Sequence, residues 1–272
     1  MIDINAWLKS QQQNTKLKRF DLELLLLGAL KVERSWLFSH ADEHLTEDQV
    51  NTLKKWVKEA QEGKPIAYIL GHQAFWTLDL LVTQDTLIPR PETEQIIELA
   101  LVLEHRPNNL LDLGTGTGAI ALSLAKEWPE SQVQACDLSK AALAVAEKNA
   151  VRNHIENASF FYSDWFSAVP KNAKFDLIVS NPPYIDPQDH HLADLAYEPI
   201  SALTADNKGL SDLEKLANQA KNHLKSKATL MLEHGYDQGP AVREILKAED
   251  YKNVITHKDL AGHDRITVAQ KA

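Results

Sequence analysis

The sequence predicts an α/β protein in which a doubly wound, mostly parallel seven-stranded sheet follows a small N-terminal helical bundle. Two observations support this fold class. From about residue 95 onward, short apolar runs alternate with segments of helical length, a pattern typical of a parallel sheet covered by helices. Before about residue 85, apolar residues recur mainly at helical spacing, which indicates a separate helical part.

The N-terminal part reads as a bundle of short helices. Thr46 and Gln49 form a capping-box pattern ahead of an apolar stripe, which indicates the start of its last long helix. Gly63 and Pro65 are helix-breaking residues that close the bundle. Apolar spacing predicts the earlier helices over 4–13, 17–30 and 34–40.

A linker and a rigid segment connect the bundle to the sheet. Residues 74–82 are rich in β-formers and predict a hairpin or short linker strands. Residues 87–92 contain two prolines and predict an extended segment, and Pro91 precedes a helix with acidic residues in its first turn.

The sheet region contains seven apolar runs and the helices between them. Strands are predicted over 110–113, 133–136, 159–162, 175–180, 228–232, 254–256 and 265–268. Helices are predicted over 93–105, 119–128, 139–152, 210–225 and 240–248. The last two strands are joined through Gly262, and we expect them to form an antiparallel pair at one edge.

The loop Gly114-Thr115-Gly116-Thr117-Gly118 follows the first strand and opens a helix. Glycines allow positive φ angles and close approach of the backbone to a ligand, and this arrangement usually binds a nucleotide-like cofactor. No P-loop lysine follows the glycines. Asp137, about twenty residues further on, ends the second strand, where an acid binds ribose hydroxyls. The loop therefore suits a ligand with a ribose but no pyrophosphate, namely S-adenosylmethionine.

Asp164, Trp165 and Phe166 follow the third strand. In a doubly wound sheet this strand end lies near the expected adenine, so the Trp165 ring can stack on the base and Asp164 can accept from its exocyclic amine. A buried tryptophan beside a capping aspartate explains the same residues equally well.

The segment Asn181-Pro182-Pro183-Tyr184 directly follows the apolar run 175–180. Ligands of open α/β sheets bind at the carboxyl ends of strands. Two prolines fix φ at consecutive positions and hold Asn181 in an extended conformation. Its amide and the neighbouring carbonyls then form a preformed set of hydrogen-bond acceptors beside an aromatic ring. Taken alone, the segment is also explained by a strand that ends at prolines before a surface tyrosine.

Composition limits the class of protein. The chain has 272 residues, of which 44% are hydrophobic and 25% charged, as in ordinary globular proteins. No apolar stretch approaches the ~20 residues of a membrane span, no signal peptide is evident, and the single cysteine fits a reducing compartment. We expect a cytoplasmic protein. The net charge of −9 argues against a duplex nucleic-acid substrate, although a local basic patch can exist within a negative total.

Two other motifs invite a chemical interpretation. His190 and His191 are adjacent in a loop, and adjacent histidines lack the spacing of zinc ligands, so we expect no metal site. Cys136 lies in a predicted buried strand, and we expect it to belong to the core.

Taken together, these motifs resemble those of the PrmC/HemK family of peptide chain release factor N5-glutamine methyltransferases, within the class I S-adenosylmethionine-dependent methyltransferases. The resemblance covers essentially the whole chain. It rests on residues 111–118 as the cofactor loop and on Asn181-Pro182-Pro183-Tyr184 as the substrate-amide motif. The segments that resemble this branch in particular are 88–94, Tyr197-Glu198-Pro199 with Ala202-Leu203, and Gly262-His263-Asp264-Arg265. The helical N-terminal segment, with Leu24-Leu25-Leu26 and residues 63–69, resembles the substrate-recognition domain of this branch.

The resemblance implies a Rossmann-like fold and a specific reaction. A methyl group passes from S-adenosylmethionine to the side-chain amide nitrogen of the glutamine in the Gly-Gly-Gln motif of release factors, and S-adenosylhomocysteine is the product. The implied domains are a substrate-recognition domain (1–72), a hairpin linker (73–86) and a methyltransferase domain (87–272). We expect a monomer that binds no membrane and no nucleic-acid substrate.

The resemblance also implies roles for individual residues. Asn181, Pro182, Pro183 and Tyr184 are expected to bind the substrate amide, with Asn181, Pro182 and Tyr184 as catalytic residues. Glu198 either lines the glutamine entrance or fixes its loop. The cofactor residues are expected to be Gly114, Thr115, Gly116, Thr117, Gly118, Asp137, Trp165 and Asn181.

Two other functions compete with this one. An adenine-N6 methyltransferase uses the same tetrapeptide on a flipped base. The acidic composition, the helical N-terminal part and segments 89–92 and 197–199 favour the glutamine enzyme. A non-catalytic S-adenosylmethionine-binding adaptor belongs to a different class, and the intact cofactor and substrate motifs disfavour it.

Overall fold

The computed structural model describes residues 2–272. The chain divides into two compact units, one ending at His72 and one running from Gln73 to Ala272. Among the described residues, no helix combines the length and the apolar character needed to cross a membrane.

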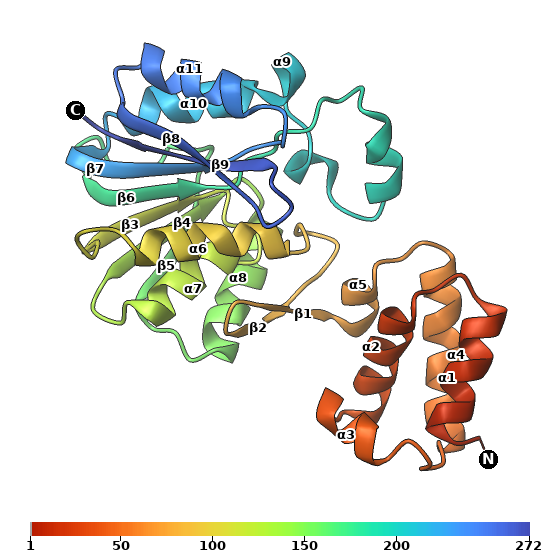
Figure 1. The fold of residues 1–272 in the computed structure, drawn as a ribbon. Helices are drawn as coiled ribbons and strands as arrows, with labels where there is room; N and C mark the ends of the chain where they lie inside the picture. The colour runs from red at the N-terminus through yellow and green to blue at the C-terminus, as the bar shows by residue number, and fades with distance from the viewer. Residues whose placement is uncertain (1) are drawn as a thin grey trace. The chain divides into compact units, whose positions relative to one another are not determined.

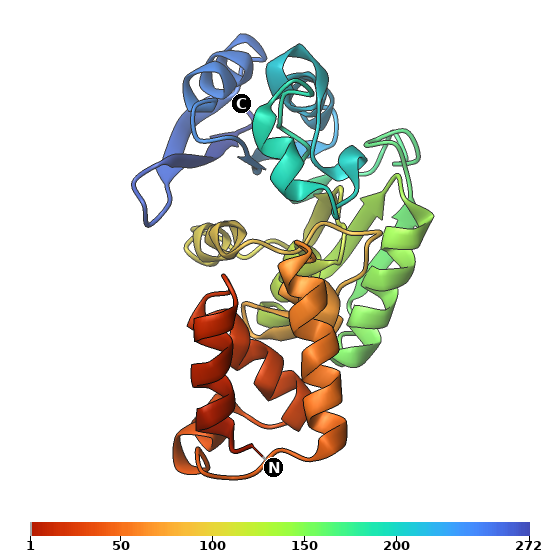
Figure 2. The same ribbon diagram turned by 90° about the vertical axis from the view of Figure 1, so that its right-hand side faces the viewer.

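The N-terminal unit is a helical bundle, drawn in red to orange (Figures 1 and 2). Its core contains fully buried leucines from different helices, among them Leu22, Leu25 and Leu53. The predicted capping box is confirmed, because Thr46 Oγ1 accepts from the Gln49 backbone and Gln49 Oε1 accepts from the Thr46 backbone. The helices are α1 (Ile4–Asn14), α2 (Arg19–Leu30), α3 (Arg34–Ser39), α4 (Glu47–Gln61) and α5 (Ile66–Leu70).

A two-stranded hairpin begins the larger unit, as the β-forming composition predicts. It consists of β1 (His72–Phe75) and β2 (Leu78–Leu81). The Asn149 side chain holds β2 in place, because it accepts from the Leu81 backbone N–H at 2.6 Å and donates to the Leu81 carbonyl at 3.0 Å.

The sheet confirms the predicted fold class. Its seven strands follow the order β5-β4-β3-β6-β7-β9-β8. The first five strands in this order are mutually parallel, whereas β9 is antiparallel to both β7 and β8. The strands are β3 (Asn109–Leu113), β4 (Gln132–Asp137), β5 (Ala158–Tyr162), β6 (Phe175–Ser180), β7 (Leu224–Glu233), β8 (Lys252–Lys258) and β9 (Asp264–Gln270). The predicted antiparallel pair at one edge is therefore present.

Helices cover both faces of the sheet (Figure 1). On one side, buried residues of α6 and α7 pack with Leu110, Leu177 and Val179. On the other side, α10 and α11 pack with Leu111 and Ile178. Alternate residues of each strand thus enter opposite cores, as the pleat requires. The helices are α6 (Glu94–Leu101), α7 (Ala119–Glu127), α8 (Lys140–Arg152), α10 (Ser211–Ala220) and α11 (Gly239–Ala248).

Two predicted helices are longer than the observed ones. The 210–225 prediction is wrong at its end, because α10 stops at Ala220 and Leu224 pairs with Phe175 as the first residue of β7. Sheet pairing and burial of Leu224 override its helical spacing. The 93–105 prediction is also too long, because α6 ends at Leu101 and Val102 is exposed rather than part of the apolar face.

The chain between β6 and α10 contains short helical elements that the sequence pattern did not predict. These are η2 (His190–Leu195), η3 (Ile200–Ala202) and α9 (Asp206–Gly209), while η1 (Pro91–Thr93) precedes α6. A bridge between Ile185 and Thr204 closes the segment 185–204 on itself.

Candidate active site

A cavity of about 520 Å³ lies at the carboxyl ends of β3, β4, β5 and β6. Such strand ends are where open α/β sheets bind ligands. Residues 84–93 contribute another part of the lining. The predicted site residues on this cavity are Gly114, Thr115, Gly116, Thr117, Asp137, Trp165, Asn181 and Pro183.

The glycine loop follows β3 and is held by β4. The backbone N–H groups of Gly114 and Thr115 both donate to the Cys136 carbonyl, at 2.9 and 3.0 Å. Gly116 has a φ of 56°, and a Cβ there would meet no atom within 4 Å. The loop therefore presents bare backbone to the cavity. Gly118 does not line the cavity; it precedes α7, where a Cβ would lie 2.9 Å from Leu122, so it serves helix packing.

Asp137 ends β4 and binds the glycine loop with its carboxylate. Oδ2 accepts from the Gly116 backbone and Oδ1 from the Ser139 backbone, each at 2.8 Å. Each oxygen keeps a further lone pair for a ligand. Burial raises the pKa of Asp137 above its ordinary value, and hydrogen bonds to the charged form oppose that effect.

Asp112 lies beneath the loop and is fully buried. Oδ2 accepts from the Thr115 hydroxyl at 2.6 Å, and Oδ1 has no partner among the described residues. Burial raises the pKa of Asp112 to about 7. Asp112 is not part of the cavity lining, so its direct effect is on the conformation of the loop.

In the segment after β5, some residues line the cavity and others belong to the core. Asp164 and Trp165 line the cavity, whereas Phe166 is buried and stacks on His223 with ring centroids 4.9 Å apart. A Cβ on Gly114 would lie 3.3 Å from the Trp165 ring. The indole therefore packs over the start of the glycine loop and forms a flat wall beside it.

Asn181 borders two cavities. Besides the cavity described above, it lines a second one of about 270 Å³. Pro183 faces the first cavity, whereas Pro182 and Tyr184 face the second. The lining of the second cavity is largely apolar and includes Leu87, Ile185, Leu195 and Leu203. Asn181 thus stands at the junction of the two spaces.

The position of Asn181 follows from the pairing of β3 with β6. Leu113 and Ser180, the last residues of these strands, are register partners, and the Ser180 hydroxyl donates to the Leu113 carbonyl at 2.7 Å. The glycine loop and Asn181 therefore leave adjacent strands at the same level.

Tyr184 is held at both its side chain and its backbone. The hydroxyl donates to Glu233 Oε1 at 3.4 Å, and the carbonyl accepts from Gln238 Nε2 at 2.9 Å. Burial and the nearby Glu233 carboxylate raise the pKa of the phenol. Gly209 packs directly on this carbonyl, because a Cβ there would lie 1.9 Å from it.

Glu198 fixes a loop and does not line either cavity. Its Oε2 accepts from the Ile88 backbone N–H at 3.0 Å, and its Oε1 binds the Arg90 guanidinium. Of the two roles that the sequence left open for Glu198, these contacts match the structural one.

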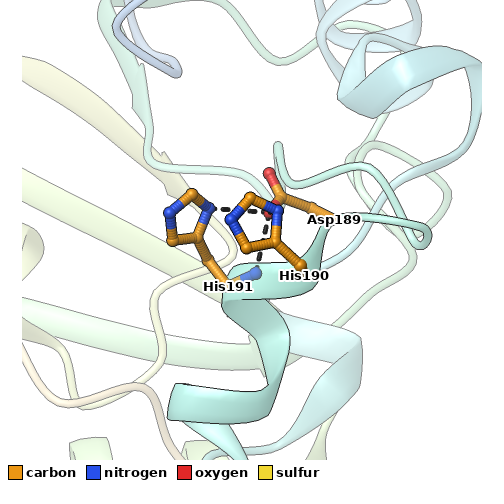
Figure 3. A group of neighbouring side chains, drawn as sticks. All are labelled: Asp189, His190 and His191. Atoms are coloured by element: carbon orange, nitrogen blue, oxygen red, sulfur yellow. Dashed lines mark hydrogen bonds and ion pairs between the residues drawn. The ribbon is translucent and has the colours of Figure 1, made fainter.

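Asp189, His190 and His191 form an exposed cluster in the segment between β6 and α10 (Figure 3). Asp189 Oδ1 accepts from the His191 backbone N–H at 2.9 Å and lies 2.8 Å from Nδ1 of the His191 ring. The Asp189 carboxylate therefore serves as the N-cap of η2, which explains its position beside the two histidines. The cluster does not belong to either cavity lining.

Several residues at the site were not singled out from the sequence. Thr93 and Arg90 come from the proline-rich segment, and Glu233 and Gln238 follow the apolar core of β7. The rule that drew attention to Asn181, a polar residue at the carboxyl end of a buried strand, also applies to Glu233.

The residues of the larger cavity fit S-adenosylmethionine. The bare backbone at Gly116 allows a close contact with the ligand. The Asp137 carboxylate has free lone pairs for ribose hydroxyls, and the Trp165 indole can pack on an aromatic base. Arg90 and Lys215 are the basic residues of the lining, and Lys215 is bound to Asp212 at 3.0 Å. This charge distribution suits a cationic sulfonium better than a pyrophosphate.

Comparisons with known proteins agree with this fold and site. Residues 97–202 match the family model of the methyltransferase small domain, and residues 6–71 match the PrmC N-terminal domain. A solved methyltransferase from Pyrococcus furiosus has a TM-score of 0.57 at 21% identity, over 79% of this chain and 97% of that one. The Thermus thermophilus 16S rRNA N2 G1207 methyltransferase, in complex with AdoMet and guanosine, has a TM-score of 0.54 at 20% identity, over 74% and 50%. At these identities the two structures support the fold.

Sequence relatives are more specific. The release factor glutamine methyltransferase of Vibrio cholerae is 45% identical over 99% of this chain and 97% of the relative. The protein of the same name from Escherichia coli is 41% identical over 99% of both chains, and that of Pseudomonas aeruginosa is 46% identical over 97% and 96%. The resemblance found in the sequence is confirmed: this chain is an S-adenosylmethionine-dependent methyltransferase and belongs to the release factor glutamine methyltransferase family.

Proposed function

We propose that this enzyme methylates the side-chain amide nitrogen, N5, of the glutamine in the Gly-Gly-Gln motif of peptide chain release factors, and so acts in translation termination. The observation that carries the proposal is the position of Asn181 between two cavities. One cavity suits the cofactor, and the other suits a small side chain that enters from outside.

The larger cavity is the proposed cofactor site. The loop from Gly114 to Thr117 contacts the ligand through its backbone, Asp137 binds the ribose hydroxyls, and Trp165 packs on the adenine. When bound there, S-adenosylmethionine supplies an electrophilic methyl group. Gly118 acts indirectly, through the start of α7.

The smaller cavity is the proposed glutamine site. Its apolar walls suit the methylene groups of a glutamine side chain, and the Tyr184 ring packs on the planar amide. The Asn181 side-chain oxygen and the Pro182 carbonyl each accept one amide N–H. With both N–H groups bound, the nitrogen lone pair is directed toward the cofactor cavity.

This arrangement compensates for a poor nucleophile. A carboxamide nitrogen attacks slowly because its lone pair is delocalised into the carbonyl. Orientation of reactants contributes roughly 7–11 kcal/mol in the most favourable cases. The two acceptors also stabilise the positive charge that develops on the nitrogen. The methylated amide is strongly acidic until it loses its extra proton to water, so no dedicated base is needed.

The N-terminal unit is proposed to recognise the release factor, since it matches the domain that the family model names. We further propose that the enzyme acts as a monomer in the cytoplasm. An adenine substrate is less favoured because the net charge is −9 and phosphate binding relies on Lys and Arg.

Methyl-labelled cofactor tests the proposal directly. The enzyme is incubated with a release factor, with the same factor after its Gly-Gly-Gln glutamine is changed to alanine, or with adenine-containing DNA and RNA. We expect label on the unaltered factor alone, with N5-methylglutamine in its hydrolysate. Label on nucleic acid, or on the altered factor, contradicts the proposal.

A further inference from the structure

Thr93 ends the 3-10 helix η1 and directly precedes α6. Its backbone is helical, with φ −67° and ψ −23°, and its side chain makes no capping hydrogen bond. The buried Thr93 hydroxyl instead accepts from Asn181 Nδ2 at 3.2 Å.

The Glu233 carboxylate is a buried neighbour of Thr93 and Tyr184. It ends β7, is 1% exposed, and accepts from the Tyr184 hydroxyl at 3.4 Å. Oε2 has no partner among the described residues. Burial raises the pKa of Glu233 to about 7, while Thr93, Arg265 and Tyr184 favour the ionised form.

The bond to Thr93 sets the orientation of the Asn181 amide. Asn181 Nδ2 is the donor and the Thr93 oxygen is the acceptor, so the NH2 group faces Thr93. The Asn181 side-chain oxygen is then left for the cavity.

We propose that Thr93 is a positioning residue that fixes which face of the Asn181 amide meets the substrate, an inference that rests on the proposed glutamine reaction. In the opposite rotamer, an NH2 group on Asn181 would oppose the NH2 group of the glutamine. Two donors cannot bond to each other, so the substrate amide would lose one of its two acceptors.

Matched substitutions at Thr93 separate this role from packing. Thr93→Val keeps the shape and removes the hydroxyl, whereas Thr93→Ser keeps the hydroxyl. We expect Thr93→Val to lower kcat by roughly 10- to 100-fold, with the Kd for S-adenosylmethionine within about threefold of wild type. Thr93→Ser is expected to retain most of kcat.

The measurements are kcat and KM with the release factor, and the cofactor Kd by calorimetry. Equal kcat for Thr93→Val and Thr93→Ser overturns the proposal, as does a parallel loss of cofactor binding and turnover in Thr93→Val. A fall in kcat restored by serine supports it.

A second readout does not depend on the substrate. In wild-type protein with isotope-labelled asparagine, the Asn181 NH2 proton bound to Thr93 should exchange with water more slowly than its twin. In Thr93→Val this difference should disappear, and an unchanged difference contradicts the proposal. Absence of release-factor methylation by wild-type enzyme would instead refute the proposed reaction. The proton exchange rates would still test whether Thr93 orients the Asn181 amide.

Discussion

The Glu198 carboxylate binds the Arg90 guanidinium across 108 positions of sequence. The same carboxylate accepts from the Ile88 backbone N–H at 3.0 Å. Arg90 borders both cavities. Glu198 therefore connects the segment 87–92 to the loop between β6 and α10, and residues of both segments line the two cavities that meet at Asn181.

Removal of the Glu198 contacts with Arg90 and Ile88 should weaken both the stability of the fold and substrate binding. Glu198→Ala leaves a buried backbone donor and a partly buried guanidinium without their acceptor, so we expect the free energy of unfolding to fall by about 3 kcal/mol. KM for the release factor should rise, and Glu198→Gln should lose less because it still accepts from Ile88. Urea denaturation and steady-state kinetics check this, and unchanged stability in Glu198→Ala contradicts it.

Asn181→Ala should separate methyl transfer from cofactor binding. We expect kcat to fall at least about 10²-fold because the substrate amide loses an acceptor, while the cofactor Kd changes much less. Asn218→Ala is the control, since Asn218 is an exposed amide on α10 that binds Glu249. Equal losses of turnover and cofactor affinity in Asn181→Ala would mean that Asn181 is mainly a cofactor contact.

Asp137→Ala should weaken cofactor binding. The change removes the proposed ribose contact and frees the Gly116 and Ser139 backbone groups. We expect the Kd for S-adenosylmethionine to rise by roughly 10- to 100-fold. Glu130→Ala, in the turn that precedes β4, serves as the control for loss of one acidic charge. Calorimetric titration checks the prediction, which is wrong if both variants bind alike.

Glu233 should make stability depend on pH. The pKa of Glu233 is about 7 in the folded protein, against 4.5 for the ordinary group. A raised pKa contributes stability below the ordinary value, and that contribution is lost as pH rises through about 7. The advantage of Glu233→Gln over wild type in unfolding free energy should thus grow by roughly 3 kcal/mol between pH 4.5 and 8.

Urea denaturation at these two pH values measures that difference. Glu244→Gln, at an exposed position on α11, should show no such growth. A difference between Glu233→Gln and wild type that stays constant with pH would show that burial does not perturb this carboxyl.

Gly209→Ala should disturb the backbone of Tyr184. Gly209 has a φ of 79°, and an added Cβ would lie 1.9 Å from the Tyr184 carbonyl. Gly262 has a φ of 84°, but a Cβ there would meet no atom within 4 Å. Gly262→Ala should therefore cost only about 1–2 kcal/mol of left-handed strain. Gly209→Ala should cost more and also lower kcat. Similar melting temperatures for the two variants would contradict this.

Strand ends could be predicted well from the sequence, whereas contacts between distant segments could not. The apolar run 175–180 and the prolines after it determine where β6 ends, and local sterics dictate that outcome. The hydrogen bond between the Thr93 hydroxyl and Asn181 depends instead on packing of segments 88 residues apart. Leu224 also shows this limit, because its spacing fits a helix and only pairing with Phe175 places it in β7.

The lateral pairing of Leu113 with Ser180 has a consequence for how such enzymes diverge. Neighbouring strands lie about 4.8 Å apart, so backbone pairing sets the spacing between the glycine loop and Asn181. Side chains of the outer walls, such as Leu195 and Leu203, do not determine that spacing. Substitutions in these walls can therefore change which protein substrate binds, while the spacing between the glycine loop and Asn181 stays constant. Recognition can thus evolve independently of the chemistry.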